Sequence, residues 1–252
     1  MIKVVITGGS SGIGEALARE YARRGAILAL IARRADLLAG LKNTLPATVA
    51  TYAADVRDAQ AMQQAAGDFI SRFGCPDVVI ANAGISGGTL TEKAEDLEVF
   101  QNILDTNVMG MVKTFQPFLA RMREQKHGTL VGIASISGFR GLPGAGAYSA
   151  SKAAAISTLE SLRVELHGSG ISVLTVCPGY IATAMTANNP YPMPFIISAE
   201  AAAKKIIRAI ERQRRFLVIP WQMAVLGRVL KILPYWLYDR LFAKAPHKPR
   251  TV

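Results

Sequence analysis

The feature that most constrains the fold of this chain is a regular alternation of short apolar runs with longer amphipathic segments. Seven apolar runs have the length of buried strands, at residues 3–6, 27–32, 48–53, 77–81, 129–134, 172–177 and 215–219. Between them lie segments with helical periodicity, at residues 12–24, 35–44, 59–73, 96–123, 148–167 and 199–212. Strands joined by crossover helices form parallel sheets. We therefore predict an α/β fold with one doubly wound parallel sheet of about seven strands and helices on both faces.

Chain length and composition are consistent with a single core. The chain has 252 residues, 50% of them hydrophobic, which suffices for one full domain. The only marked change in composition follows Pro220, so we expect a catalytic domain at residues 1–220 and an apolar, basic C-terminal extension at residues 221–252. The start of the chain lacks the pattern of a signal peptide, and the two cysteines, Cys75 and Cys177, fit buried free thiols better than a disulfide. These features favour a cytoplasmic protein.

The positive charge is concentrated near the C-terminus. Residues 1–203 contain 17 basic and 16 acidic side chains, whereas residues 204–252 contain 12 basic and 2 acidic ones. A local positive field of this kind favours contact with an anionic surface. Nucleic acid is a poor candidate, because the charge is not accompanied by a motif that reads bases. The three histidines do not have the spacing of metal ligands, so we expect no metal site.

A glycine-rich loop follows the first predicted strand. It reads Thr7-Gly8-Gly9-Ser10-Ser11-Gly12-Ile13-Gly14, directly before the first predicted helix. Glycines allow a tight turn and a close approach of backbone to a pyrophosphate, and the free N–H groups of the helix bind phosphate. The loop therefore predicts a dinucleotide site.

Two arginines follow the second predicted strand, where an acidic residue would favour an unphosphorylated ribose. Arg33 and Arg34 instead suit a 2′-phosphate, because a charge-assisted hydrogen bond contributes about 1.5–3 kcal/mol. The cofactor predicted is NADP(H), and Ser11 can add a hydroxyl contact. The alternative is that both arginines are simply solvated at a helix start.

Tyr148 and Lys152 lie four residues apart, on one face of a predicted helix. A free tyrosine has a pKa of about 10, and a nearby ammonium brings it closer to the range of a general acid/base. The pair alone is weak support, since this spacing is common by chance. Ser135 strengthens it, because it ends the fifth predicted strand, where its hydroxyl can donate to a developing oxyanion.

Polar residues also end neighbouring strands. Asp55-Val56 follows the third and Asn82-Ala83-Gly84 the fourth, and Asn107 falls inside the long predicted helix, where an amide has low propensity. Packing alone explains such a set poorly.

Together these motifs resemble the short-chain dehydrogenase/reductase superfamily over about residues 1–220, which implies a Rossmann-type fold. The resemblance implies that Tyr148 is the general acid/base and that Ser135 polarises the carbonyl. It also implies that Lys152 holds the nicotinamide ribose and that Asn107 keeps a proton-relay water. The implied cofactor contacts are Thr7, Gly8, Ser10, Ser11, Gly12, Ile13, Gly14, Arg33, Arg34, Asp55, Val56, Asn82, Ala83, Gly84, Tyr148, Lys152, Pro178, Gly179, Ile181 and Thr183.

The C-terminal sequence departs from many relatives, which carry an Asp-Gly-Gly signature after a strand that closes a tetramer. Here residues 215–220 run into a long extension. This is similar to the branch that acts on steroids, retinoids and lipid ketones, and it implies a homodimer through the long helices rather than a tetramer.

The extension mixes aromatic and aliphatic residues with Lys and Arg, and Pro220 and Pro234 interrupt it. It is too broken for a spanning helix and has the character of an interfacial one. We expect peripheral contact with an anionic cytoplasmic membrane face; packing over the substrate pocket or a dimer partner is an equal and compatible alternative.

The function predicted is hydride transfer between NADP(H) and a carbonyl or secondary alcohol of a bulky, apolar small molecule. A non-catalytic NADP(H)-binding sensor or scaffold is the first alternative. An epimerase or dehydratase is less favoured, because the chain lacks a sizeable C-terminal sugar-binding domain.

Overall fold

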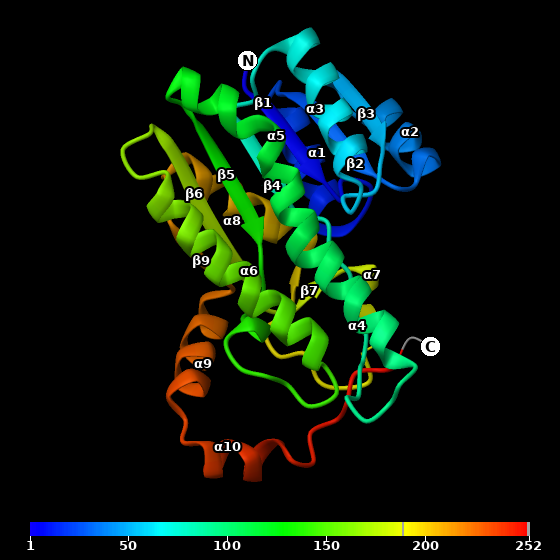
Figure 1. The fold of residues 1–252 in the computed structure, drawn as a ribbon, viewed down its shortest axis with the longest axis vertical. Helices are drawn as coiled ribbons and strands as arrows, with labels where there is room; N and C mark the ends of the chain where they lie inside the picture. The colour runs from blue at the N-terminus through cyan, green and yellow to red at the C-terminus, as the bar shows by residue number, and fades with distance from the viewer. Residues whose placement is uncertain (188, 251–252) are drawn as a thin grey trace.

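The computed structural model describes residues 1–187 and 189–250 and contains one seven-stranded parallel sheet (Figure 1). The strand order is β3-β2-β1-β4-β5-β6-β9, so the connections reverse direction between β1 and β4. The strands are β1 (Lys3–Thr7), β2 (Ile27–Ala32), β3 (Val49–Ala53), β4 (Val78–Ala81), β5 (Gly128–Ile133), β6 (Ile171–Pro178) and β9 (Phe216–Ile219). The predicted doubly wound, Rossmann-type sheet is confirmed.

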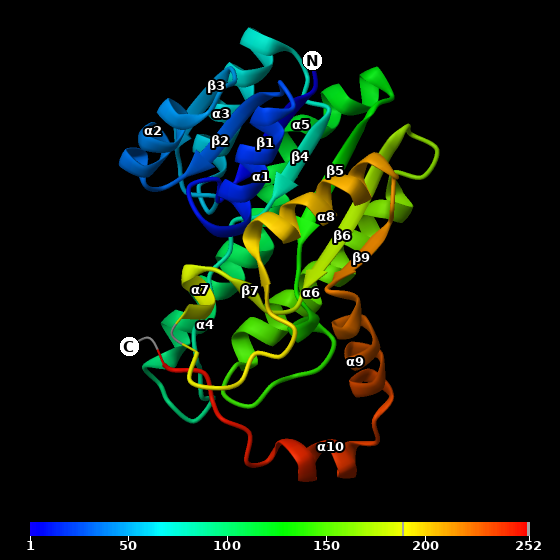
Figure 2. The same ribbon diagram turned by 180° about the vertical axis from the view of Figure 1, so that it is seen from behind.

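Helices cover both faces of the sheet, as Figures 1 and 2 show from opposite sides. One face carries α1 (Gly12–Arg23), α2 (Ala35–Thr44) and α8 (Ala199–Glu211); the other carries α3 (Ala59–Phe73), α5 (Gly110–Gln125) and α6 (Gly146–Glu165). Each helix buries one apolar stripe, so two separate clusters of buried side chains sandwich the sheet.

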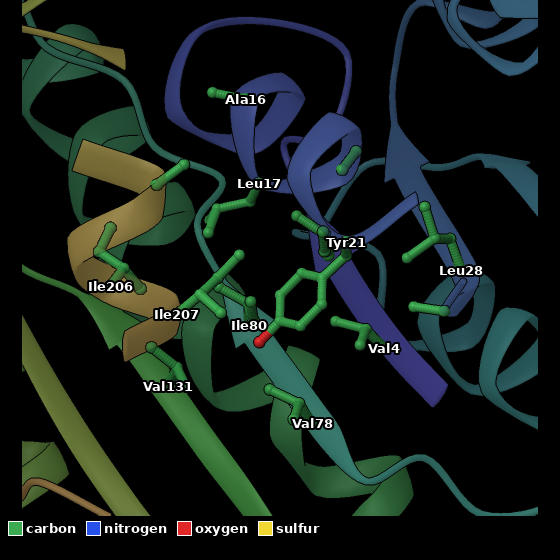
Figure 3. Close-up of a cluster of buried hydrophobic side chains, with 14 of the residues drawn as sticks. Val4, Ala16, Leu17, Tyr21, Leu28, Val78, Ile80, Val131, Ile206 and Ile207 are labelled. Atoms are coloured by element: carbon green, nitrogen blue, oxygen red, sulfur yellow. The ribbon is translucent and has the colours of Figure 1, made fainter. Parts of the chain in front are cut away.

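Tyr21 lies within the cluster between α1, α8 and the sheet. Its ring packs among aliphatic side chains, and its hydroxyl points into the space between Ile207, Val131 and Val78 (Figure 3). Among the described residues this buried hydroxyl has no hydrogen-bond partner. Burial accordingly raises the pKa of Tyr21 well above its ordinary value.

The extended helix predicted over residues 96–123 is present as a continuous helical segment, but it is not α-helical throughout. The structure has α4 (Asp96–Leu104), a π-helical turn (Asp105–Met109) and then α5. The side chain of Asn107 in this turn bonds the backbone of Ile85, a partner outside the helix. A π turn admits an extra residue, and such turns are frequent at functional sites.

The segment after β6 contains structure that periodicity did not indicate. A two-stranded parallel sheet joins β7 (Ile181–Ala182) to β8 (Ile197–Ser198), and a short helix, α7 (Ala184–Ala187), lies between them. These elements are too short to show a repeat in the sequence.

The C-terminal extension leaves β9 through α9 (Trp221–Ile232) and α10 (Tyr235–Phe242). It then runs beyond the carboxyl ends of the strands and returns to α4, as the orange and red segments of Figure 1 show. Tyr238 donates to the carbonyl oxygen of Gly141 at 2.5 Å, and Arg140 donates to that of Leu233 at 3.1 Å. Across the described residues, none of the helices combines the length and apolar character needed to cross a bilayer.

Candidate active site

A cleft of about 430 Å³ lies at the carboxyl ends of the strands and contains most of the residues singled out from the sequence. It begins at the glycine loop, passes the end of β2 and reaches the start of α6. The predicted residues that line it are Gly8, Ser10, Ser11, Gly12, Ile13, Arg33, Arg34, Asp55, Val56, Asn82, Ala83, Gly84, Ser135, Tyr148, Lys152, Pro178, Gly179, Ile181 and Thr183. Parallel strands place such ends together at the switch point of the sheet.

Thr7, Gly14 and Asn107 lie behind the cleft wall rather than in it. Thr7 is fully buried, and its hydroxyl oxygen accepts from the backbone N–H groups of Asn82, at 3.2 Å, and Ala83, at 3.3 Å. The structure therefore gives Thr7 a supporting position, in which it joins the end of β1 to the segment after β4.

The glycine loop is held close to neighbouring backbone. A Cβ at Gly14 would lie 2.2 Å from the carbonyl oxygen of Gly8, and one at Gly8 would lie 2.9 Å from Cα of Ala83. Gly8 and Gly12 also adopt positive φ angles of 65° and 56°. The loop thus needs these glycines to keep the N-terminus of α1 open to a ligand.

A cationic end of the cleft adjoins this loop. The Arg34 guanidinium donates to the hydroxyl oxygens of Ser11, at 3.1 Å, and Ser10, at 3.3 Å. Arg57 bonds the carboxylate of Asp55 and, with a smaller contribution from Arg33, holds the pKa of Asp55 below its usual range. The guanidinium groups of Arg33 and Arg34 and the hydroxyls of Ser10 and Ser11 can all donate to one anion placed here.

The other end of the cleft brings Ser135 and Tyr148 together. Ser135 directly follows Ala134 after β5, and its hydroxyl accepts from the N–H of Ser137 at 3.1 Å. Burial raises the pKa of the Tyr148 hydroxyl, and a hydrogen bond with Ser135 opposes that rise. At neutral pH the phenol is therefore protonated and can act as an acid.

Lys152 lies one helical turn beyond Tyr148 and is 5% exposed. Its ammonium lies 5.7 Å from the centre of the Tyr148 ring and donates to the carbonyl oxygen of Ile133 at 2.8 Å. Burial lowers the pKa of Lys152 to about 8. The sequence predicted that Lys152 lowers the pKa of Tyr148. In this structure Ser135 is the group that lowers it, and burial outweighs that effect.

Asn107 supports the same end of the cleft from the π turn. Its carbonyl oxygen accepts from the N–H of Ile85 at 2.8 Å, and its amide donates to the carbonyl of Ile85 and to Ser151, both at 3.0 Å. A Cβ at Gly84 would lie 3.1 Å from Oδ1 of Asn107 and 3.6 Å from Nζ of Lys152. A side chain at Gly84 would therefore crowd the amide of Asn107.

Some residues of the site carried no motif in the sequence. Thr106, Ile85, Met185 and Thr186 line the cleft. Lys248, in the C-terminal extension, does not itself line the cleft, but its ammonium lies 5.6 Å from the centre of the Tyr148 ring. Its signal in the sequence was only the general positive charge of the tail, which does not indicate where one side chain lies.

Comparisons with known proteins agree with this geometry. A family model described as short chain dehydrogenase matches residues 3–192. An uncharacterized oxidoreductase of Myxococcus xanthus (strain DK1622) is 40% identical over 238 residues, covering 93% of this chain and 94% of that protein. The 11-beta-hydroxysteroid dehydrogenase 1A of Arabidopsis thaliana is 35% identical over 251 residues, covering 90% of this chain and 71% of that protein.

Solved structures show the same architecture. An alcohol dehydrogenase from the archaeon Thermococcus sibiricus, complexed with 5-hydroxy-NADP, has a TM-score of 0.75 at 26% identity, covering 87% of this chain and 96% of that one. A short chain dehydrogenase/reductase from Burkholderia phymatum, in complex with NAD, has a TM-score of 0.83 at 24% identity and covers 100% and 98% of the two chains; it supports the fold alone.

This chain belongs to the short-chain dehydrogenase family. It is an oxidoreductase of that family, whose fold binds a nicotinamide cofactor. The residues present fit such a dinucleotide, because the cleft begins at a close-packed glycine turn beside a cationic end and finishes at Tyr148 and Lys152.

Proposed function

We propose that this protein transfers a hydride between NADP(H) and a carbonyl or secondary alcohol of a bulky, apolar small molecule. Residues 1–220 form the catalytic domain in this proposal, and residues 221–252 form the C-terminal extension. The observation that carries it is the convergence of Ser135, Tyr148 and Lys152 at one end of the cleft, with Arg33 and Arg34 at the other.

The roles of these residues follow from their positions. Tyr148, protonated at neutral pH, donates a proton to the substrate oxygen in the reductive direction, and Ser135 donates a hydrogen bond to the same oxygen. Lys152, fixed on Ile133, faces the nicotinamide ribose, and Asn107 keeps the Ile85 segment and a relay water in place. The nicotinamide, when bound, supplies or accepts the hydride.

The preference for NADP(H) rests on the cationic end of the cleft. Arg34 already lies on the hydroxyls of Ser10 and Ser11, where a 2′-phosphate of the adenosine ribose can receive all three donors. Arg33 adds positive charge beside Asp55. An NAD-selective site would instead place a carboxylate here to bind the ribose hydroxyls.

An apolar substrate is supported by the cleft and by the relatives. Ile85 and Met185 are apolar residues that line the cleft. The Arabidopsis relative is named as a hydroxysteroid dehydrogenase. This name favours a substrate of the same bulky, apolar class for the present protein.

A membrane surface and a second copy of this chain are the partners that we propose. Large exposed side chains of α9 and α10 include Trp221, Val225, Val229, Ile232, Tyr235, Trp236 and Leu241, and the cations Arg228, Lys231, Arg240 and Lys244 lie among them. Apolar residues with flanking cations suit an anionic bilayer interface. For the homodimer, exposed apolar residues lie on the long helices: Leu97 on α4, Met109 in the π turn, Val112 on α5 and Val164 on α6.

The test is to measure reduction of steroid, retinoid, acyl and sugar carbonyls by purified protein with NADPH and NADH. We expect turnover of at least one bulky apolar carbonyl, with higher kcat/KM for NADPH. Tight NADPH binding without turnover of any member would favour the sensor alternative instead.

A further inference from the structure

The last described residues of the extension form a strap across the active-site side of the molecule. This C-terminal strap, residues 246–250, lies against the loop that follows β4, and the N–H of Gly88 donates to the carbonyl oxygen of Pro249 at 3.0 Å. A Cβ at Gly144 would lie 2.7 Å from Cβ of His247, so the strap also touches the loop before α6. It thus bridges two loops that flank Tyr148.

The end of the strap is fixed by Arg250. Its guanidinium donates to Asp96 through Nε, at 3.0 Å, and through Nη2, at 2.9 Å, and Nη2 also donates to Glu95 at 2.9 Å. Asp96 is 3% exposed, and its hydrogen bonds with Arg250 lower its pKa. A forked, charge-assisted contact of this kind holds a segment in one geometry. Arg250 therefore anchors the end of the strap.

That other cation is Lys248, which lies half-buried beside Tyr148. Its ammonium donates to the hydroxyl oxygen of Ser86 at 2.7 Å and lies 5.6 Å from the centre of the Tyr148 ring. No carboxylate of residues 1–187 or 189–250 lies within ion-pair distance of it. Burial lowers the pKa of Lys248, as expected for a cation partly removed from water. An ammonium has three donors, so up to two remain for a ligand.

We propose that Lys248 is a substrate-binding residue that receives a carboxylate carried by the carbonyl substrate. Placing an ammonium partly out of water costs free energy unless an anion compensates it. Here the hydrogen bonds of Arg250 with Asp96 and Glu95 hold the strap so that the Lys248 ammonium lies beside Ser86 and Tyr148. This inference rests on the proposed function and narrows the substrate to an apolar carbonyl compound with an anionic group. Arg250 is the positioning residue for Lys248.

The kinetic test uses 2-, 3- and 4-carboxybenzaldehyde, each paired with its methyl ester, and NADPH. The three isomers sample different distances between carbonyl and carboxylate. We expect at least one acid to be reduced with higher kcat/KM than its ester, and Lys248→Met to lower that preference about tenfold or more, the effect of one hydrogen bond to a charged group. Lys248→Arg should retain the preference, and Lys244→Met, which changes an exposed lysine of the same extension, should leave it unchanged.

A binding test separates this inference from the proposed function. Benzoate and benzamide are titrated into protein saturated with NADP⁺, which occupies the other cationic site at Arg33 and Arg34. We expect benzoate to bind more tightly than benzamide, and Lys248→Met and Arg250→Gln to weaken benzoate at least tenfold while NADP⁺ affinity is unchanged. Equal affinity for benzoate and benzamide would overturn the role of Lys248. An affinity for benzoate that Lys248→Met does not change would overturn it as well. Failure to reduce any aldehyde, with benzoate binding as expected, counts against the proposed reaction instead.

Discussion

The ammonium of Lys152 donates to the carbonyl oxygen of Ile133, 2.8 Å away, at the last residue of β5. Because Ser135 follows two residues later and Tyr148 lies one turn before Lys152, this bond joins the two sides of the candidate active site. It also keeps a cation almost fully buried, which lowers the pKa of Lys152 to about 8. Burial of the Lys152 ammonium thus fixes the geometry of the site but lowers the stability of the folded protein.

The first prediction concerns the effect of buried Lys152 on the free energy of unfolding. In the unfolded chain Lys152 has a pKa near 10.4, so between about pH 8 and 10 the unfolded state binds more protons than the folded one. Stability contributed through Lys152 therefore rises with pH across this window and is lowest below pH 8. We measure urea unfolding without cofactor at pH 8 and at pH 10. The free energy of unfolding of wild type, relative to that of Lys152→Met, should increase by about 2 kcal/mol between these two pH values. A difference that does not change with pH would contradict a lowered pKa of Lys152 in the folded protein.

The second prediction tests the cationic end of the cleft. Arg34→Ala should weaken NADPH by about 10- to 100-fold and NADH little, because it removes charge-assisted bonds to a 2′-phosphate. Arg33→Ala should act in the same direction. The measurement is a dissociation constant for each cofactor, with Arg23→Ala, an exposed arginine of α1, as the control. Equal losses for both cofactors would show that these arginines bind no 2′-phosphate.

The third prediction concerns the core. Tyr21→Phe removes a buried hydroxyl that has no partner among the described residues and leaves the ring in place. Since an unsatisfied buried donor costs about 1–3 kcal/mol, the variant should raise the free energy of unfolding by about 1 kcal/mol or more. Denaturant unfolding measures this, and a destabilised variant would mean that an ordered water satisfies the hydroxyl.

The fourth prediction concerns the membrane surface. Trp221 is 70% and Trp236 is 69% exposed, with cations around them, so changing both to Ser should reduce sedimentation with anionic liposomes. Binding by wild type should also fall at high salt, because the charges are then screened. Leu37→Ser, at an exposed leucine of α2, is the control. Wild-type protein that ignores liposomes at every salt concentration would leave the extension as a packing element only.

Much of this architecture could be predicted from the sequence, because buried strands and amphipathic helices have distinct periods. The helices at residues 35–44 and 59–73 have the predicted bounds, and Gly25 ends α1 with a φ of 71°. The clustering of strand ends followed from the parallel topology alone. The roles assigned to Ser135, Tyr148, Lys152 and Asn107 remain predictions.

Other features could not be predicted, because they depend on contacts between distant segments. The π turn forms where Asn107 bonds Ile85, a pairing across 22 positions. The approach of Lys248 to Tyr148 depends on the hydrogen-bonded ion pair between Arg250 and Asp96, which lie 154 positions apart. Local patterns hold no information on such pairings, and the burial that raises the pKa of Tyr148 belongs to the folded state only.

Hydride transfer with Tyr148 as the general acid is tested by following deuterium from NADPH labelled at the nicotinamide C4 into the product alcohol, with wild type and Tyr148→Phe. The carbonyl substrate is the best one from the panel above. We expect deuterium at the carbinol carbon with wild type. We expect less than a few per cent of that rate with Tyr148→Phe, whose NADPH affinity stays unchanged, because only the exchangeable proton is removed. Label transfer by Tyr148→Phe at a rate near that of wild type would contradict the role of Tyr148 as the general acid.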